Sequence, residues 1–250
     1  MTADIAPKPG HQITNRQHFI ARSVLKRFAG NGGKVQVLEF ATGETANCGP
    51  DDDRFVVRRH WDQRSESRVM QDIERRFGSI AASVLRGKAL RSDRAFHTTI
   101  SEMYALWRPR FELAVRPMPD MQLAVSGVER EVAPAMRDQL EHHGVIVPDA
   151  AGRIAGRSLA GVSLMRMLDM HAIQMTLTKW AVVRAHEGEF VLPDTFGQFL
   201  VLPLAPTYCF IADNENGVID RDTVADLNAL AKRSAHRFIV ARDIAACPGI

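Results

Sequence analysis

The sequence predicts an α+β fold: a mainly helical body with a long central helix and a small, largely antiparallel sheet. Two observations carry this prediction. Apolar residues at helical spacing dominate residues 69–186, whereas short β-branched and aromatic runs bounded by turn residues occur toward both ends of the chain. The 250 residues are 46% apolar and 24% charged, which is ordinary for a globular protein and excludes disordered and low-complexity classes.

The N-terminal part is expected to contain a tail, a helix and two strands. Residues 1–14 read as a loose tail. A short helix is predicted between an N-cap at Asn15 and a stop at Gly30. The run Lys34–Phe40 has strand character and is followed by a turn, and 54–57 is expected to be a second, short strand.

Helices are predicted to fill the middle of the chain. One is stopped by Gly87, and the next is capped by Ser92 or Asp93 and bent or ended by Pro109. A third opens with a capping box at 126–129. The segment 158–186 is apolar around most of its circumference, which predicts the central helix of the core. On this basis Trp180 and Leu177 are expected to be deeply buried.

Strands are predicted to return near the C-terminus. They occupy 189–192, 199–204, 207–212 and 237–241, and a helix at 222–234 precedes the last of them. We expect residues 15–245 to form a single compact domain.

The cellular compartment is predicted from the N-terminal residues, the most apolar stretch and the cysteines. The first ten residues have no apolar core of a signal peptide, and the most apolar long stretch, Leu159–Val183, contains charged residues, so it is not expected to span a membrane. The three cysteines form no CxxC motif, which disfavours a disulfide framework and a cysteine-rich zinc site. We therefore expect a cytoplasmic protein with no membrane association.

Charge is uneven along the chain. Residues 1–120 contain 20 Lys and Arg against 14 Asp and Glu, whereas residues 121–250 contain 12 against 15. Arginine side chains bind phosphates well, so the basic half is a candidate nucleic-acid surface. The alternative is a solvated helix face whose arginines are balanced by neighbouring acids.

A family resemblance adds to this interpretation. The segment Gln17–Ala29, followed by Gly32–Val37, resembles the opening of a widespread bacterial domain of unknown function, whose signature is His-Tyr-x-Pro-x-x-Tyr-Leu-x-x-Phe before a glycine turn and a strand. Further elements similar to that family are Gln71–Glu74, Leu192–Asp194, Pro203–Pro206 and Leu227–Asn228. Ala21, Val24, Pro193 and Ala205 depart from the signature, so the chain resembles a diverged member. The resemblance implies fold and compartment, because the family has no assigned activity.

Candidate site residues are polar groups at element ends or on apolar faces. His18 stands at a predicted helix start with Arg22 and Lys26 nearby, and imidazole suits proton transfer. Asp194 follows a strand, where carboxylates often act as bases or metal ligands. His171 lies on a polar stripe of the central helix. For each, the alternative is a structural role in a junction, a turn or the core.

Two further residues belong to this set. Glu74 lies next to an apolar helix stripe and Asn228 on the inner face of the last helix, so each is a candidate binding residue. The alternatives are a solvated ion pair for Glu74 and a buried amide bonded to backbone for Asn228.

Together these features lead to two functional hypotheses. The first is a phosphodiester-acting, nuclease-like hydrolase of a bacterial defence or toxin type, with His18, Asp194 and His171 as catalytic residues and Arg22, Lys26, Glu74 and Asn228 as binding residues. The second is a non-enzymatic module that binds nucleic acid or protein. No cofactor is specified by the sequence, a divalent metal being one candidate, and the oligomeric state stays open.

Overall fold

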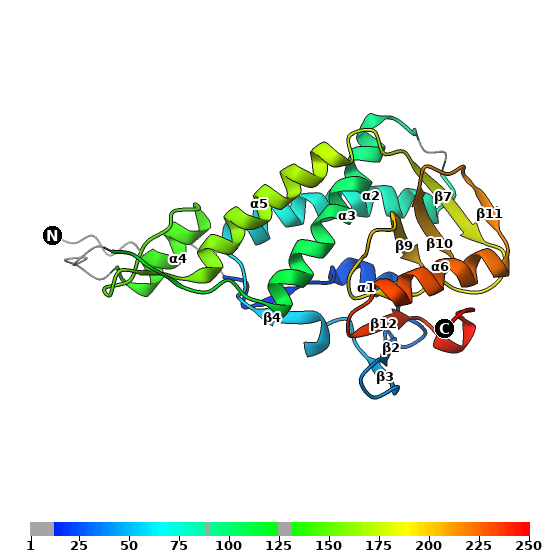
Figure 1. The fold of residues 1–250 in the computed structure, drawn as a ribbon, viewed down its shortest axis with the longest axis horizontal. Coiled ribbons are helices and arrows are strands. Elements are labelled where there is room, and N and C mark those ends of the chain that lie inside the picture. The colour runs from blue at the N-terminus through cyan, green and yellow to red at the C-terminus, as the bar shows by residue number, and fades with distance from the viewer. Residues whose placement is uncertain (1–12, 89–90, 125–131) are drawn as a thin grey trace.

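The computed structural model describes residues 13–88, 91–124 and 132–250 (Figure 1). It confirms the predicted α+β class, because helices predominate and the strands form small sheets whose pairing is largely antiparallel. Most of the predicted N-terminal tail, residues 1–12, lies outside the described residues.

The N-terminal segment contains a strand where the sequence predicts a helix. β1 (Arg16–His18) pairs antiparallel with β4 (Val56–Arg58), and α1 (Arg22–Phe28) begins only after it. The predicted helix start is wrong because the buried Gln17 side chain exchanges two hydrogen bonds with the backbone of Trp61. These long-range bonds hold the segment extended.

Two four-stranded sheets form the β part of the fold. The first has the order β3-β2-β12-β8 and is antiparallel throughout. The last strand of the chain, β12, therefore lies between β2, from the N-terminal part, and β8. The second has the order β11-β7-β10-β9, in which β11 and β7 are parallel. Their bounds are β2 (Val35–Glu39), β3 (Thr45–Cys48), β7 (Trp180–Ala185), β8 (Leu192–Pro193), β9 (Val201–Ala205), β10 (Tyr208–Ala212), β11 (Gly217–Ile219) and β12 (Phe238–Ala241).

The helices form the body of the molecule. α3 has the predicted cap at Asp93 but continues past Pro109, and the capping box predicted at 126–129 lies outside the described residues. The bounds are η1 (Asp53–Phe55), the π-helical η2 (Ser65–Met70), α2 (Gln71–Leu85), α3 (Arg94–Val115), α4 (Pro134–His142), α5 (Gly156–Gln174), α6 (Arg221–Ser234) and η3 (Ile244–Ala246). A short pair, β5 (Met121–Gln122) and β6 (Arg153–Ile154), lies near α4 at one end of the elongated molecule (Figure 1).

The predicted central helix is shorter and less buried than expected. α5 ends at Gln174, and the β-branched residues that follow enter β7. Trp180 is buried as predicted, but Leu177 is 88% exposed, so its predicted burial is wrong. The apolar pattern was compatible with either a helix or a strand, and the sheet pairing with β10 decided the outcome.

One large apolar core joins segments that are far apart in the sequence. It extends from Phe19 to Val240 and includes side chains of helices and both large sheets. The two ends of the chain touch as expected: Arg27 Nε donates to the carbonyl of Leu204 at 2.9 Å, and β2 pairs with β12. Within the described ranges, none of the helices combines the length and apolarity needed to cross a bilayer.

Candidate functional site

His18 is held at the junction between β1 and α1. Its Nε2 lies 3.2 Å from the carbonyl oxygen of Pro50 and 3.5 Å from Oδ1 of Asp51, and the same carboxylate accepts a hydrogen bond from Arg22. Burial lowers the pKa of His18, although the Pro50 carbonyl and the Asp51 charge act in the opposite direction. Near neutral pH this imidazole is therefore the unprotonated, proton-accepting form.

The predicted binding residues Arg22, Lys26 and Glu74 lie around His18. The Arg22 hydrogen bond lowers the pKa of Asp51, and the charge of exposed Lys26 acts in the same direction. Glu74, from α2, is close enough for its charge to raise the pKa of His18, and it forms an ion pair of 2.6 Å with Arg110.

Two partly or fully buried arginines support this region. Arg110 is 2% exposed and pairs with Glu74. Arg27 lies over the ring of Phe77, 5.4 Å from its centroid, and burial lowers its pKa to about 10. Arg27 Nη2 is buried and has no hydrogen-bond partner among the described residues.

Asp194 is fully buried, and backbone groups use both of its oxygens. Oδ1 accepts from the N–H of His236 and Oδ2 from the N–H of Arg237, each at 2.8 Å. Burial raises the pKa of Asp194, against the effect of these two bonds. The Arg237 guanidinium, 3.6 Å from Oδ2, lies over the ring of Phe19, so Asp194 is linked to the His18 segment through one arginine.

Asn228 and His171 lie in other parts of the fold. Asn228 is buried on α6, accepts from the N–H of Val191 and donates to the carbonyls of Glu189 and Pro248, so its amide ties three segments together. His171 is half-buried in the last turns of α5. The structure thus gathers His18, Arg22, Lys26 and Glu74, connects Asp194 indirectly, and shows no polar contact between the His18 region and His171 or Asn228 among the described residues.

The described residues offer no ready-made metal centre. Nowhere in the ranges that the structure describes do three or more His, Cys, Asp or Glu side chains gather in a way that could hold a metal ion. All three cysteines are free and buried, and burial raises the pKa of the Cys48 thiol to about 11 and that of Cys247 to about 12. Both thiols are therefore in the poorly reactive, protonated form.

A second candidate site, not predicted from the sequence, is a cavity of about 650 Å³ between α2, α3 and α5. This volume lies in the range of about 300–1,000 Å³ that is typical of small-molecule sites. Its walls are mainly apolar. They include Val69, Ile73, Met165, Leu168, Ile173 and Met175.

The charged groups at this cavity are only partly paired. Arg76 bonds to both Asp72 and Glu102, so its charge is compensated. Arg68 and Arg94 also line the cavity, and neither forms an ion pair with any residue that the structure describes. Two guanidinium groups are therefore available to an anionic group of a ligand.

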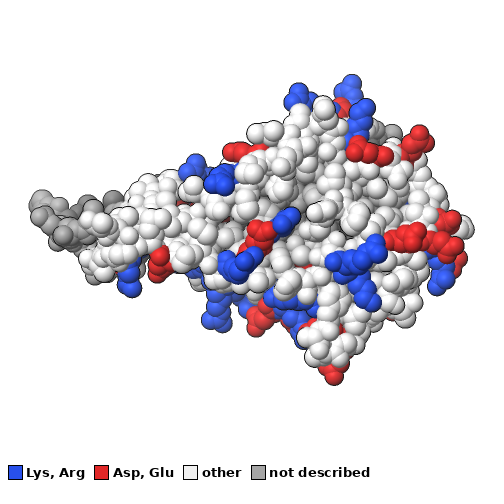
Figure 2. Space-filling model, in the orientation of Figure 1, with Lys and Arg blue, Asp and Glu red and all other residues white. Residues whose placement is uncertain are grey.

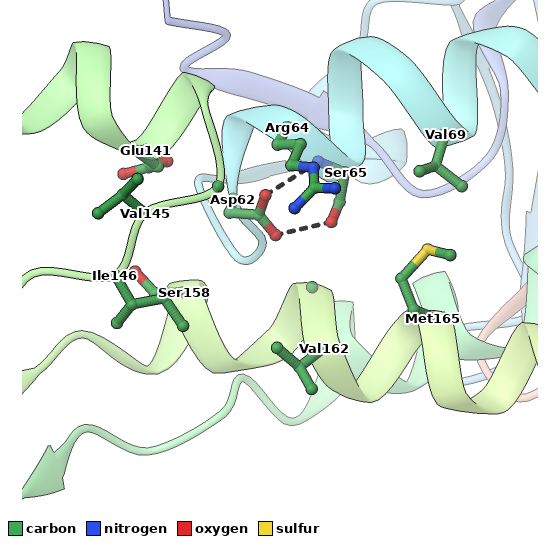
Figure 3. A pocket seen from close by; sticks show the side chains of 12 residues that line it. Asp62, Arg64, Ser65, Val69, Glu141, Val145, Ile146, Ser158, Val162 and Met165 are labelled. Atoms are coloured by element: carbon green, nitrogen blue, oxygen red, sulfur yellow. Dashed lines mark hydrogen bonds between the residues drawn. The ribbon is translucent and has the colours of Figure 1, made fainter.

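A smaller hollow of about 160 Å³ continues the cavity toward α4, and the two share Val69 and Met165 (Figure 3). At its floor the Asp62 carboxylate accepts from the Ser65 backbone N–H at 2.9 Å and from its hydroxyl at 2.7 Å. α5 passes directly over this pair at Gly161, where an added Cβ would lie 1.7 Å from Asp62 Oδ2. The close approach of α5 therefore requires glycine at this position.

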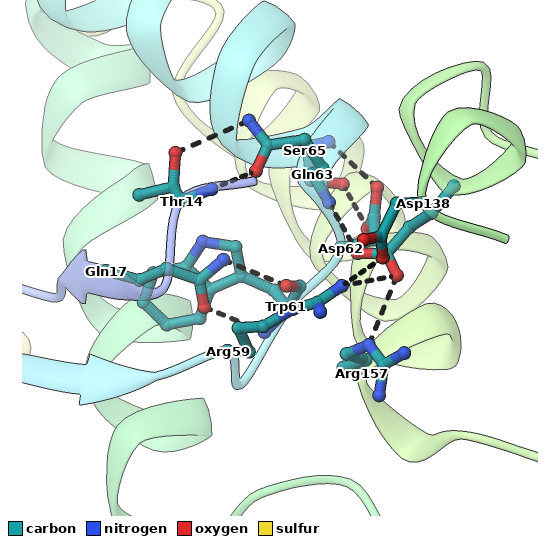
Figure 4. Close-up of polar contacts among 10 residues, drawn as sticks. Thr14, Gln17, Arg59, Trp61, Asp62, Gln63, Ser65, Asp138 and Arg157 are labelled. Carbon is teal, nitrogen blue, oxygen red and sulfur yellow. Dashed lines mark hydrogen bonds and ion pairs between the residues drawn. The ribbon is translucent and has the colours of Figure 1, made fainter. Parts of the chain in front are cut away.

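The wall shared by both hollows is the π-helical turn η2. π-helical turns are rare and are frequent at functional sites, because they displace side chains from the regular helical positions. A polar network holds the start of this turn in place (Figure 4). Buried Glu141 of α4 accepts from Arg59 at 2.8 Å, from Arg157 at 3.2 Å and from the N–H of Gln63 at 3.1 Å, and the Gln63 side chain accepts from the N–H of Thr14 at 2.7 Å.

Comparison with family models, curated proteins and solved structures finds no match to this chain. The resemblance of the His18 segment to a bacterial domain of unknown function therefore stays a prediction. The sequence does not predict the cavity, because a central helix that is apolar around most of its circumference is expected to be buried on nearly every side. One feature of the sequence points to the cavity: α5 carries more apolar residues than are needed to cover a single face.

Proposed function

We propose that the protein is a non-enzymatic binding module whose cavity between α2, α3 and α5 takes a small amphiphile with an anionic head group. The observation that carries this proposal is the combination of a 650 Å³ apolar cavity with two arginines, Arg68 and Arg94, that have no ion-pair partner among the described residues. An apolar pocket with a few converging polar groups is the usual form of a small-molecule site.

The chemistry of the ligand follows from the two kinds of lining. The side chains of Ile73, Leu168 and Met175 favour an aliphatic or aromatic body, because burial contributes about 25 cal/mol for each Å² of apolar surface. Arg68 and Arg94 favour a carboxylate, sulfonate or phosphate, since guanidinium forks bind such groups in two-pronged geometry. Asp169, which has no ion pair in the described part of the chain, disfavours a doubly charged head beside it.

The test compares decanoate with decanol, which has the same chain and no charge, by titration calorimetry. Wild type should bind decanoate more tightly than decanol. Arg68→Gln and Arg94→Gln should each weaken decanoate by about five-fold, or about 1 kcal/mol, because a partly exposed pair contributes about that much, and should leave decanol unchanged. Arg233→Gln, which changes an exposed arginine of α6, is the matched control. Equal binding of decanoate by all four proteins, or binding by none, would exclude the proposal.

A phosphodiester hydrolase is the second candidate, and one observation favours it. His18 has a lowered pKa and lies beside exposed Arg22 and Lys26, which is an arrangement able to accept a proton next to a bound phosphate. Cleavage of single-stranded RNA and DNA, with and without divalent metal, should be measured for wild type, His18→Ala and Arg22→Gln. Loss of cleavage in His18→Ala at an unchanged melting temperature would favour the hydrolase. Equal residual cleavage by all three proteins would exclude it.

A further inference from the structure

Helix α5 has apolar residues on opposite sides but is covered on only one. Its inner residues Ala160, Gly161, Leu164 and Leu168 are buried, and α5 packs against α3. Apolar residues also occupy the outer side, where Val162 is 63% and Ile173 is 76% exposed. An apolar side of a helix is normally covered by another element.

No described element packs against that outer side, although Val162, Met165, Asp169 and Ile173 also border the two hollows. α5 lies along one edge of the molecule, and no other element lies beyond it in this view (Figure 1). The surface over α5 is mostly white, with a few basic and acidic side chains on it (Figure 2). We define the outer strip of α5 by the side chains that share this side: Val162, Met165, Arg166, Asp169, Met170 and Ile173.

The two charges in the outer strip have opposite signs and no ion-pair partners among the described residues. Arg166 and Asp169 are three positions apart and both exposed, yet the structure shows no ion pair between them. Both belong to the middle of α5 and are flanked on each side by exposed apolar residues. A partner for the strip must therefore offer one charge of each sign between two apolar groups.

We propose that the partner is the outer strip of α5 in a second copy of this chain, packed antiparallel about a two-fold axis between Met167 and Leu168. That register places Val162 opposite the second copy's Ile173, and Met165 at the level of its Met170. It also places Arg166 opposite Asp169 of the second copy, twice over by symmetry. A contact about a two-fold axis uses the same surface of both copies, so an apolar residue must lie opposite an apolar residue and a basic residue opposite an acidic one.

The expected dimer is weak and concentration-dependent. α5 has 19 residues and so extends about 28 Å, and one helix face covers less area than the roughly 800 Å² per partner of a standard interface. We therefore expect dissociation within the micromolar range that the experiment below covers. Met165, Asp169 and Ile173 of the strip also lie at the cavity, whereas Arg166 does not. The inference does not rest on the proposed ligand, because the pairing of charges across the two-fold axis needs no ligand.

Sedimentation velocity from about 5 to 200 µM tests the register by charge exchange. Wild type should dimerise within this range. Arg166→Asp and Asp169→Arg should each raise the dissociation constant at least ten-fold, because each places like charges opposite one another. The double variant R166D/D169R should dimerise again, and an equimolar mixture of the two single variants should form a heterodimer.

The control is Arg233→Asp, an exposed charge reversal on α6 that should leave the dissociation constant unchanged. Decanoate binding by Arg166→Asp tests the proposed function separately from the dimer. A variant that is monomeric but still binds decanoate shows that the cavity is intact. A wild type that stays monomeric at 200 µM, or single variants that dimerise as well as wild type, would overturn the proposal. So would a folded double variant that remains monomeric.

Discussion

Replacing Asp194 by asparagine tests whether this buried carboxylate is structural. In the native protein its two oxygens accept the backbone N–H groups of His236 and Arg237 at 2.8 Å, just before β12 begins. The asparagine side chain would keep one oxygen, and its amide NH₂ would face the other N–H. One buried donor is then left without an acceptor, in the turn that fixes the pairing of β8 with β12.

The magnitude follows from those two bonds. A hydrogen bond to a charged group contributes about 1.5–3 kcal/mol, and the lost bond also leaves a buried N–H unsatisfied. Removing the charge offsets part of this cost, because burial disfavours the ionised form of Asp194 and raises its pKa. We expect Asp194→Asn to lower the free energy of unfolding by about 2–4 kcal/mol, and Asp194→Ala by about 3–5 kcal/mol because both N–H groups are then left unpaired.

Urea denaturation at pH 7, followed by far-UV circular dichroism, measures this loss. Ser234→Ala provides a control for a nearby polar residue, since its hydroxyl donates to a carbonyl within α6. A loss below about 1 kcal/mol for Asp194→Asn would refute the structural interpretation. If nucleic-acid cleavage were also found, and this variant abolished it at unchanged stability, the catalytic role predicted for Asp194 would stand.

Three further outcomes follow from the structure. Leu177→Ala should cost less than about 0.5 kcal/mol because the side chain is 88% exposed, whereas Leu164→Ala should cost about 2–5 kcal/mol; equal losses in urea melts would contradict the packing of α5. Gly161→Ala should destabilise by about 1–3 kcal/mol, since its Cβ would lie 1.7 Å from Asp62 Oδ2, and an unchanged melting temperature would show that this contact is not tight. Burial lowers the pKa of His97, whose Nδ1 accepts a backbone N–H of β7 at 3.0 Å, so its contribution is complete above about pH 6.5 and is lost as pH falls through the lower folded pKa. His97→Asn should therefore reduce the loss of stability between pH 7 and pH 5, and a steeper loss in the variant would reverse the assigned sign.

Elements whose signals are local could be predicted from the sequence. Asp93 caps α3 as expected because its side chain reaches the N–H three residues on, and α6 begins close to its predicted start for the same reason at Asp220. The sequence predicts a bend or an end of the helix at Pro109. This proline sits inside α3 without ending it, since the helix is buried on both sides of that position and packing outweighs one lost hydrogen bond.

The errors arise where a distant partner decides the structure. Gln17 belongs to a strand because its side-chain amide donates a hydrogen bond to the carbonyl of Trp61, 44 positions away. The candidate site follows the same rule: Arg22 and Lys26 could be associated with His18 through helical spacing, whereas the Asp51 carboxylate joins them from another element. The cavity beside α5 depends on three helices and on arginines that lack partners in the described chain, and no local pattern encodes either.

The position of β12 between β2 and β8 has a consequence during synthesis. Gln36 accepts a hydrogen bond from the N–H of Ile244, 208 positions later, so the first sheet cannot close until β12 has also left the ribosome. At about 5–20 residues per second the nascent hairpin of β2 and β3 waits on the order of 10–40 s with an open edge. Unpaired edges of this kind pair with other chains. The free edge of β2 is therefore open to pairing with other copies of the chain until β12 is available.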